Sequence, residues 1–360
     1  MANIRQVAEL AGVSPATASR VLGTSASRPP VSVDAGRRVR EAASTLGYRV
    51  NYHMRAVATG RANATGFASE VTLDPHAGVG SGNMYFDALR RGVEYTTQEA
   101  GSALMSVHPG RGLSALQRGT QYLMEHRLDA LVIPASKFVV SAAHLFEADP
   151  QLPLVLINYD GKINRPNVWF DLPAAMRLIV DHLACLGHRR ALWFGPQSDP
   201  DSGISQRQRL FIQTAWETGL QGATCLANVE PLGRFSESDK LIDLARAAMT
   251  AKLAEPDRNW TAIVAYNDQW AVAACAALAA AGLRVPTDVS VVGFDNLIGQ
   301  FCVPALTTID HQFYEMGRRA GSLAAQLIEA TAEQRQTLNH HIETVAPLLI
   351  HRATTAPAKT

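Results

Sequence analysis

The chain has 360 residues, of which 47% are hydrophobic and 18% charged, so it is long enough for two or three domains with large cores and is not disordered. Its four cysteines form no CxxC pair and no Cys/His cluster with metal-ligand spacing, so we expect free thiols, no metal and no other cofactor. No apolar run reaches membrane-spanning length, and the N-terminus lacks the apolar region of a secretion signal, so we expect a cytoplasmic protein without a membrane partner.

Charge is unevenly distributed along the chain. Residues 1–61 hold nine arginines, no lysine and three acidic residues, which is a net charge of +6. Because the whole chain carries +1, residues 62–360 carry −5. A basic head on a mildly acidic body is typical of a head that binds nucleic acid and a body that does not.

The first 22 residues predict two short helices that bury each other. They run over residues 3–11 and 15–22 and are joined by Gly12-Val13-Ser14. Apolar residues recur at helical spacing on one face of each helix. These inward-facing residues are Val7, Leu10, Ala11, Ala18, Val21 and Leu22.

The outer face of the second helix is available to a partner. Ser14 is a suitable N-cap, and Pro15 stands at the first helical position, where a missing N–H costs nothing. The residues left on the outer face are Pro15, Ala16, Ser19 and Arg20. This is the helix-turn-helix arrangement, in which the second helix enters the major groove, so the sequence predicts double-stranded DNA as a partner.

A third helix and a linker complete the head. The amphipathic pattern predicts a helix at about residues 32–46, ended by Gly47 as a left-handed cap. Residues 50–61 follow as a short segment with a possible cap at Asn51, too short to be stable alone. We therefore expect an all-α headpiece over residues 1–49 and a hinge over residues 50–61.

Beyond about residue 64, short β-rich runs alternate with helical stretches, which predicts an α/β fold with parallel sheets. The expected strands are 65–71, 103–107, 130–133, 154–158, 191–195, 262–265 and 289–293. The expected helices are 87–100, 113–126, 173–186, 208–218, 239–253 and 269–281. These are too many units for one sheet, and a break near residues 169–173 indicates two similar lobes, with a ligand in the cleft at the carboxyl ends of the strands. We expect residues 353–360 to be a disordered tail.

Six blocks, in order along the chain, resemble the LacI/GalR family of bacterial transcription regulators. They are VAELAGVSPATASRVL (7–22), LGY with Asn51 (46–51), YFDALRRGVE (85–94), HLACLGHRRALWFG (182–195), AYNDQWAVAACAALAAAGLRVPTDVSVVGFDN (265–296) and PALTTID with YEMGRRA (304–320). The resemblance implies a helix-turn-helix headpiece, a hinge helix and a two-lobed core similar to periplasmic binding proteins, each lobe a parallel sheet flanked by helices. It also implies a homodimer built through the core, residues 62–352. We expect lobe 1 at 62–171 and 312–331, and lobe 2 at 172–311 and 332–352.

The resemblance assigns DNA-binding roles to the second helix. Matched by motif, Pro15, Ala16 and Arg20 occupy its base-reading positions. Only Arg20 can make the bidentate contact that favours guanine, whereas Pro15 and Ala16 offer apolar contact. The residues expected to bind phosphate are Ser14, Thr17 and Ser19. Arg20 as a simple phosphate clamp is the alternative.

The hinge departs from the family pattern. Val50 stands for the family's Pro, Met54 for an Ala, and Val57 for the Leu that enters the minor groove, while Arg55 is retained. Met54 and Val57 are three residues apart and share one helical face, so we expect them to act together as a wedge. Alternatively, both only pack hinge against hinge in a dimer. The hinge residues expected at DNA are Asn51, Met54, Arg55 and Val57.

In the core, the resemblance implies a small-molecule effector: a sugar, sugar acid or sugar phosphate. Asp295 would accept hydrogen bonds from paired hydroxyls and Arg209 would donate a fork, while an aromatic face covers the apolar side of a ring. The expected effector residues are Tyr85, Phe86, Asn158, Arg209, Asn267 and Asp295. Each has a structural alternative: a turn at Asp295-Asn296, a helix cap at Asn267-Asp268, or core packing of the aromatic pair.

The expected function is a ligand-responsive, sequence-specific transcriptional regulator and not an enzyme. In its most specific form it is a repressor of a carbohydrate-use operon that binds a palindromic operator as a dimer. A Rossmann-type oxidoreductase is disfavoured, because the glycine run at residues 78–82 lacks the third spaced glycine and the lysine of phosphate-binding loops. A solute receptor would need a secretion signal and no basic helix-turn-helix head.

Overall fold

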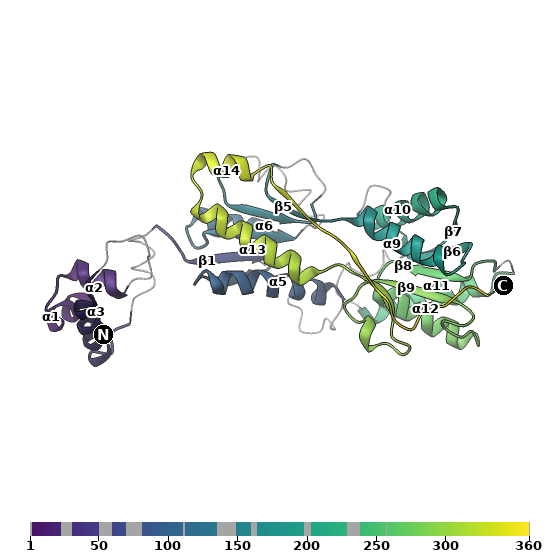
Figure 1. Cartoon of the computed structure of the whole chain (residues 1–360), viewed down its shortest axis with the longest axis horizontal. Coiled ribbons are helices and arrows are strands. Elements are labelled where there is room, and N and C mark those ends of the chain that lie inside the picture. Colours follow the sequence, from purple (N-terminus) through teal and green to yellow (C-terminus); the bar gives the residue numbers. More distant parts are fainter. Residues whose placement is uncertain are drawn as a thin grey trace. The chain divides into compact units, whose positions relative to one another are not determined.

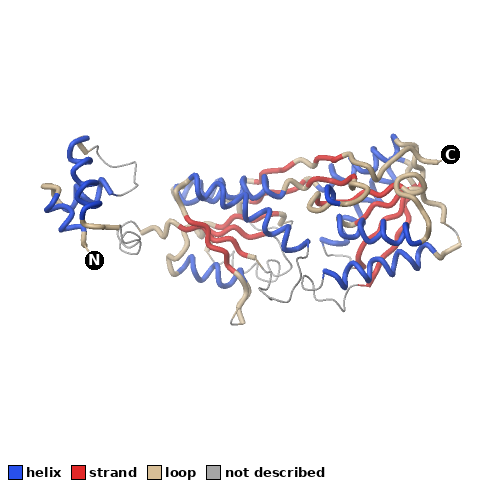
Figure 2. Tube along the Cα trace, turned by 90° about the horizontal axis from the view of Figure 1, so that it is seen from below, coloured by secondary structure: helices blue, strands red, loops and turns tan. Residues whose placement is uncertain are grey.

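The structure of the chain is a computed structural model (Figures 1 and 2). It describes residues 2–22, 31–49, 60–69, 81–110, 112–134, 149–159, 164–197, 203–228, 238–256 and 258–359. The chain divides into two compact units, Met1–Ala62 and Asn63–Thr360. The expected hinge contacts Asn51, Met54, Arg55 and Val57 lie outside the described residues.

The first unit contains the three expected helices. They are α1 (Ile4–Leu10), α2 (Pro15–Leu22) and α3 (Val33–Thr45). Asn3 caps α1 by accepting hydrogen bonds from the backbone N–H groups of Arg5 and Gln6, and the Gln6 side chain accepts one from the Asn3 N–H. Gly47 follows α3 with a φ of 59°, a left-handed conformation that glycine adopts without strain. The helix-turn-helix prediction is confirmed.

The core of this unit is small and built largely from alanine. Its buried residues are Val7, Ala8, Ala11, Ala18, Val39, Ala42 and Ala43. The expectation that Leu10 faces inward is wrong, since this side chain is 56% exposed. Val7, Ala8 and Ala11 form the seam of α1 that faces the other two helices, and Leu10 lies beyond the edge of that seam.

The second unit contains two sheets, as Figure 2 shows in red. Among the described residues, the first sheet has the order β11-β5-β4-β3-β1-β2, and all its neighbouring strands are parallel. Its strands are β1 (Ala64–Ala68), β2 (Ala103–Val107), β3 (Ala130–Pro134), β4 (Leu154–Ile157), β5 (Asn167–Phe170) and β11 (Ile342–Val345).

The second sheet has the order β12-β10-β9-β8-β6-β7 and is parallel except for the edge strand β12, which is antiparallel to β10. Its strands are β6 (Arg190–Gln197), β7 (Gln221–Asn228), β8 (Ala262–Ala265), β9 (Ser290–Asp295), β10 (Thr307–Asp310) and β12 (Leu348–Ile350). The two-lobed α/β prediction is confirmed. The strands missed from sequence are β5, β7, β10, β11 and β12.

Helices cover both sheets. In the first lobe they are α5 (Ser81–Glu99), α6 (Ala115–Met124), α13 (Phe313–Glu329) and α14 (Ala332–Leu338). In the second lobe they are α9 (Leu172–Cys185), α10 (Gly203–Thr218), α11 (Ser238–Leu253), α12 (Asp268–Ala280) and a 3-10 turn, Gly299–Phe301. Trp193 and Val264 face α9 and α10, whereas Leu192 and Ile263 face α11 and α12, so alternate strand residues fill the two faces. In the described part of the chain, no helix has the length and apolar character needed to cross a membrane.

In the first lobe, α5 and α13 run side by side at very short range (Figure 1). A Cβ placed on Gly317 would lie 2.0 Å from the backbone oxygen of Leu89, and one on Gly92 would lie 2.0 Å from that of Tyr314. Only glycine permits this approach, because the opposing atoms are backbone and cannot rotate away.

Among the described elements, the chain passes from one lobe to the other after β5, after β10 and after β11. The expected assignment of residues 332–352 to lobe 2 is therefore wrong for residues 332–345. These residues form α14 and β11, and β11 extends the first sheet by pairing with β5. The pairing of β11 could not be read from a strand of only four residues.

The expectation of a disordered tail is wrong for residues 353–359. Thr354 is fully buried, and its hydroxyl donates to the Val291 carbonyl at 2.7 Å while accepting from the Thr307 N–H at 2.8 Å. The N–H of Ala358 donates to the Leu186 carbonyl at 2.8 Å. Hydroxyl and backbone hydrogen bonds, rather than apolar side chains, attach this segment to the second lobe, which is why its composition resembled a free tail.

Candidate DNA-binding and effector sites

The outer face of α2 is open to a partner. Ser14, Pro15, Ala16 and Ser19 are exposed, while Thr17 and Arg20 are half-buried. The Ser14 hydroxyl accepts the Thr17 N–H at 3.1 Å, so this side chain caps the helix and marks the start of the exposed face.

Arg20 lies along the surface of its own helix. Its Nη2 donates a hydrogen bond to the Thr17 hydroxyl at 3.2 Å, and its Nε donates a long one to the Ala16 carbonyl at 3.4 Å. A guanidinium has five N–H donors, so these contacts leave capacity for a bidentate contact to a base edge. The contacts with Ala16 and Thr17 also hold the Arg20 guanidinium on the exposed face of α2.

Two acidic side chains of the headpiece, Asp34 and Glu41, belong to α3 and pair with arginines of the same helix. Asp34 pairs with Arg37 at 2.8 Å and with Arg38 at 3.3 Å, and Glu41 pairs with Arg37 at 3.0 Å. The arginines of α3 are thereby partly neutralised, whereas the contacts of Arg20 are a hydroxyl and a carbonyl. Positive charge is therefore less compensated on α2 than on α3.

In the core, charged and aromatic groups meet at the carboxyl ends of β8 and β9. Arg207 of α10 donates from Nη1 to the Tyr266 carbonyl at 2.8 Å and from Nη2 to Asp295 Oδ1 at 3.3 Å. Its guanidinium also lies over the rings of Phe294 and Tyr266, at 4.3 and 4.8 Å from their centroids. Asp295 has a φ of 101°, a strained conformation for a residue with a Cβ, and such strain is concentrated at functional sites.

Asp295 has a second partner that the sequence did not indicate. Its Oδ1 lies 3.1 Å from Nδ1 of His311, which is 4% exposed. Burial lowers the pKa of His311 to about 4, so the ring is neutral at pH 7. Because a carboxylate only accepts hydrogen bonds, Nδ1 of His311 must carry the proton.

Two polar residues of the first lobe join this group. The Tyr85 hydroxyl is hydrogen-bonded to the Asn158 side chain, and burial, followed by the nearby Asp295 carboxylate, raises the pKa of Tyr85. Tyr85 therefore stays protonated and can donate. Asn158 Oδ1 accepts the Phe170 N–H at 3.0 Å, which fixes this amide at the end of β4.

We call the side chains of Tyr85, Asn158, Arg207, Asp295 and His311 the interlobe cluster. Of the expected effector residues, the structure brings Tyr85, Asn158 and Asp295 together in it. Phe86 is 6% exposed and packs edge-on against Tyr85, 4.9 Å between centroids, as part of the core. Asn267 caps α12 by accepting the Trp270 N–H at 3.1 Å, which realises the helix-cap alternative.

The structure places Arg207, and not the expected Arg209, in the interlobe cluster. Arg209 is exposed, and its Nη1 donates to Ser205 Oγ at 2.7 Å. The two arginines are two residues apart on α10, about 200° around a helix, and so lie on opposite faces. Arg207 precedes the buried Phe211 by four residues, and this spacing was the signal that could have selected it.

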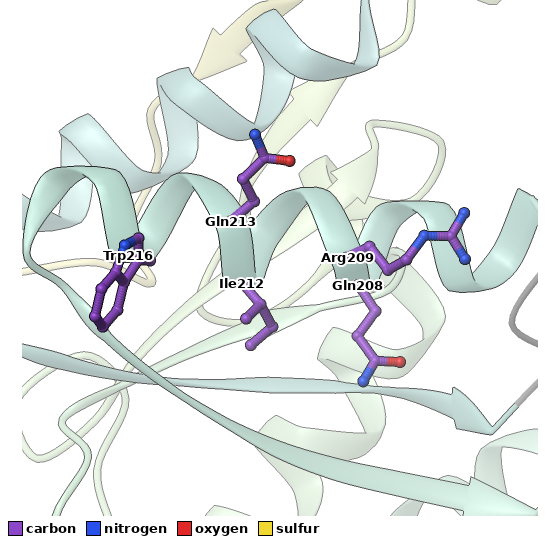
Figure 3. Close-up of a pocket in the computed structure, with 5 residues that line it drawn as sticks. All are labelled: Gln208, Arg209, Ile212, Gln213 and Trp216. Atoms are coloured by element: carbon purple, nitrogen blue, oxygen red, sulfur yellow. The ribbon is translucent and has the colours of Figure 1, made fainter.

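Arg209 instead borders an open hollow on the outer surface of α10. The residues that line the hollow are Gln208, Arg209, Ile212, Gln213 and Trp216. In Figure 3 Gln208, Ile212 and Trp216 point to one side of the helix and Gln213 to the other. Trp216 is 85% exposed, and this hollow does not include any residue of the interlobe cluster.

Asp268 fixes the loop that follows Asp295. It is 2% exposed, and its carboxylate accepts the Thr308 hydroxyl at 2.6 Å and the N–H groups of Ile298 and Gly299, both at 3.2 Å. Burial raises the pKa of Asp268 to about 6. The residue lies next to Asn267 and holds the end of β9 against the start of α12.

Comparison with known proteins places both units in one family. The family described as bacterial regulatory proteins, lacI family, matches residues 3–51, and a periplasmic binding protein-like domain matches residues 180–355. The transcriptional regulator GalR of Escherichia coli (strain K12) is 30% identical over 333 residues, covering 91% of this chain and 90% of GalR. The transcriptional repressor PurR of Aliivibrio fischeri (strain ATCC 700601 / ES114) is 25% identical over 349 residues, covering 96% and 97%.

Solved structures share the fold. The Lac repressor dimer bound to operator and the anti-inducer ONPF has a TM-score of 0.74 at 22% identity and covers 99% of both chains. The Lac repressor bound to ONPG has a TM-score of 0.73 at 24% identity. With the match to GalR over nine-tenths of both sequences, the chain belongs to the lacI family of bacterial regulatory proteins and is a DNA-binding transcriptional regulator.

Proposed function

We propose that this regulator is a cytoplasmic repressor whose operator affinity is controlled by a sugar-like effector bound at the interlobe cluster. The observation that carries the proposal is Asp295, whose carboxylate is held by Arg207 and His311 where strand ends of the two lobes meet. The same chain presents an exposed helix-turn-helix face. Its relatives are regulators, and the proposal assigns the chain no catalytic step.

On the DNA side, Arg20 reads a guanine and Pro15 and Ala16 make apolar base contacts. The phosphate contacts are Ser14, Thr17 and Ser19. The exposure of the α2 face and the absence of a carboxylate from the contacts described for Arg20 support this assignment. The hinge residues proposed at the operator centre are Asn51, Met54, Arg55 and Val57. A homodimer on a palindromic operator is supported by the fold shared with the operator-bound Lac repressor dimer.

On the effector side, the cluster offers complementary groups for a polyol. Asp295 accepts hydrogen bonds from hydroxyls, Tyr85 donates, and Asn158 does both. Related folds have been solved as a regulator CelR–cellobiose complex and as an Enterococcus faecium regulator with bound ribose, with TM-scores of 0.63 and 0.62. We therefore propose a sugar, sugar acid or sugar phosphate as effector, with Asn267 as a further contact at the start of α12.

Control follows from the position of the cluster. Its residues come from both lobes, so an effector there stabilises one relative arrangement of the lobes. In a dimer, that arrangement would set the spacing of the two headpieces. Operator affinity depends on both headpieces binding at once, so a modest change in spacing changes it strongly.

The proposal is tested on the full-length protein in two steps. An operator is first selected from random duplexes, and a thermal-shift screen covers ribose, lactose, cellobiose, gluconate and glucose 6-phosphate. We expect at least one compound to raise the melting temperature and to change operator affinity measured by fluorescence anisotropy. A protein that binds the selected operator but whose affinity responds to no compound of these classes would contradict effector control.

A further inference from the structure

His311 lies on one of the chain segments that cross between the lobes. It follows β10 of the second lobe and precedes α13 of the first. The next residue, Gln312, has a φ of 53°, and its N–H donates to Asp310 Oδ1 at 2.7 Å. The crossing is therefore a defined turn, and the ring of His311 is placed by it.

The partners of His311 come from both lobes. Its ring packs against Phe170 at 3.8 Å between centroids and stacks on Phe313 at 4.5 Å and 16°, and both phenyl rings belong to the first lobe. Its Nδ1 contacts Asp295 of the second lobe at 3.1 Å. A movement of one lobe against the other must therefore either move the ring from between the phenyl groups or alter its contact with Asp295.

The two oxygens of the Asp295 carboxylate differ in their contacts. Arg207 and His311 both engage Oδ1, so Oδ2 keeps its acceptor capacity for a hydroxyl. The charged groups around the neutral ring are Asp295 on β9, Asp310 on β10 and Arg207 on α10. A hydrogen bond between a neutral donor and a carboxylate, buried at this site, is stronger and more directional than one in water.

We propose that His311 is a positioning residue that ties the orientation of the Asp295 carboxylate to the crossing between the lobes. An effector that engages Asp295 is then sensed at the crossing through the Nδ1 hydrogen bond. The inference rests on the proposed function for its biological meaning, but the mechanical link between Asp295 and the first lobe can be measured without an effector.

The link is tested by hydrogen–deuterium exchange on the full-length protein in a double-mutant cycle. Asp295→Ala removes the acceptor in the second lobe, and His311→Phe keeps a flat ring between the phenyl groups but removes the donor. We expect Asp295→Ala to raise the exchange rate of residues 167–171 and 311–316 at least fivefold in the wild-type background. In the His311→Phe background the same change should add less than twofold.

His311→Gln serves as the matched variant, because it keeps an N–H donor and loses the ring that packs against the first lobe. Since the link needs both the hydrogen bond and the ring, Asp295→Ala should raise exchange less than twofold in this background too. Should His311→Phe fail to fold, His311→Leu replaces it as the variant without a donor. An increase in the His311→Phe or His311→Gln background equal to that in the wild type would overturn the inference. A wild-type protein that binds none of the screened saccharides would count against the proposed function, while the exchange cycle still decides the role of His311.

Discussion

The headpiece and the interlobe cluster differ in the sequence separation of their functional residues. The proposed DNA face lies on one short helix, within residues 14–20, and its spacing already determines which side chains point outward. The interlobe cluster takes Tyr85 from α5, Asn158 from the end of β4, Arg207 from α10, Asp295 from β9 and His311 from a crossing. A local pattern can specify a helix face, whereas the cluster depends on sheet order and on where the chain changes lobes.

The largest expected difference between the two units is the cost in stability of replacing a helical glycine by alanine. In α13, Gly317→Ala places a Cβ 2.0 Å from a backbone oxygen of α5, so we expect a loss of roughly 3 kcal/mol of core stability. In α3, the same change at Gly36 meets only the Arg40 guanidinium, at 3.2 Å, which can move aside. Gly36→Ala should be neutral or stabilise α3 by up to about 1 kcal/mol.

Urea unfolding followed by tryptophan fluorescence measures the core alone, because all five tryptophans lie beyond residue 62. Hydrogen exchange of the α3 amides measures the headpiece. A wild-type unfolding midpoint for Gly317→Ala would show that α5 and α13 do not approach as closely as described.

Among the described contacts of the headpiece, Arg37 pairs with carboxylates and Arg20 does not, so the two arginines should differ in their contribution to operator affinity. Arg20→Ala should weaken binding to the selected operator by about 1–3 kcal/mol, a loss typical of one bidentate base contact, and should change binding to random duplex little. Arg37→Ala is the matched control, since Arg37 is occupied by Asp34 and Glu41 on α3. Arg55→Ala should weaken both kinds of DNA alike. Anisotropy titrations at fixed salt measure these affinities, and an equal loss on both DNAs for Arg20→Ala would make Arg20 a phosphate clamp.

Lowering the pH should reduce the folding stability of the core more than that of the headpiece, because residues 1–49 contain no histidine. Burial lowers the pKa of His311 to about 4, so between pH 6.5 and 4 the unfolded chain binds more protons than the folded one and stability falls as pH falls. The pKa of His182 is lowered to about 4 and that of His188 is also lowered, both chiefly by burial, which acts in the same direction. The raised pKa of Asp268 opposes them, since its folded form gains the proton first.

For the 4%-exposed His311 the effect is at most about 1.4 kcal/mol per pH unit. We expect the urea midpoint of the core to fall between pH 6.5 and 5, and His311→Gln to flatten the profile. A His311→Gln profile as steep as that of the wild type would show that burial does not lower the pKa of His311 in the folded state.

The sequence predicted the helix-turn-helix and the two α/β lobes because long amphipathic periods and alternating apolar runs survive without tertiary information. Strands such as β11 and β12 were missed because they are short and only partly buried, and their place depends on pairing with distant partners. Arg207 and Arg209 both fit the QRQR pattern, and only the side of α10 that faces the core separates them. His311 gave no local signal, because its partners Asp295 and Phe170 are brought to it by the crossing.

The most direct test compares Arg207→Gln with Arg209→Gln in the effector response of operator binding. Both changes remove one positive charge from α10, but only Arg207 contacts Asp295. With the saccharide that alters wild-type operator affinity, we expect Arg209→Gln to respond as the wild type does. Arg207→Gln should still bind the operator but require at least tenfold more saccharide for the same response. A normal response in Arg207→Gln, or a response lost only in Arg209→Gln, would contradict the placement of the effector at the interlobe cluster.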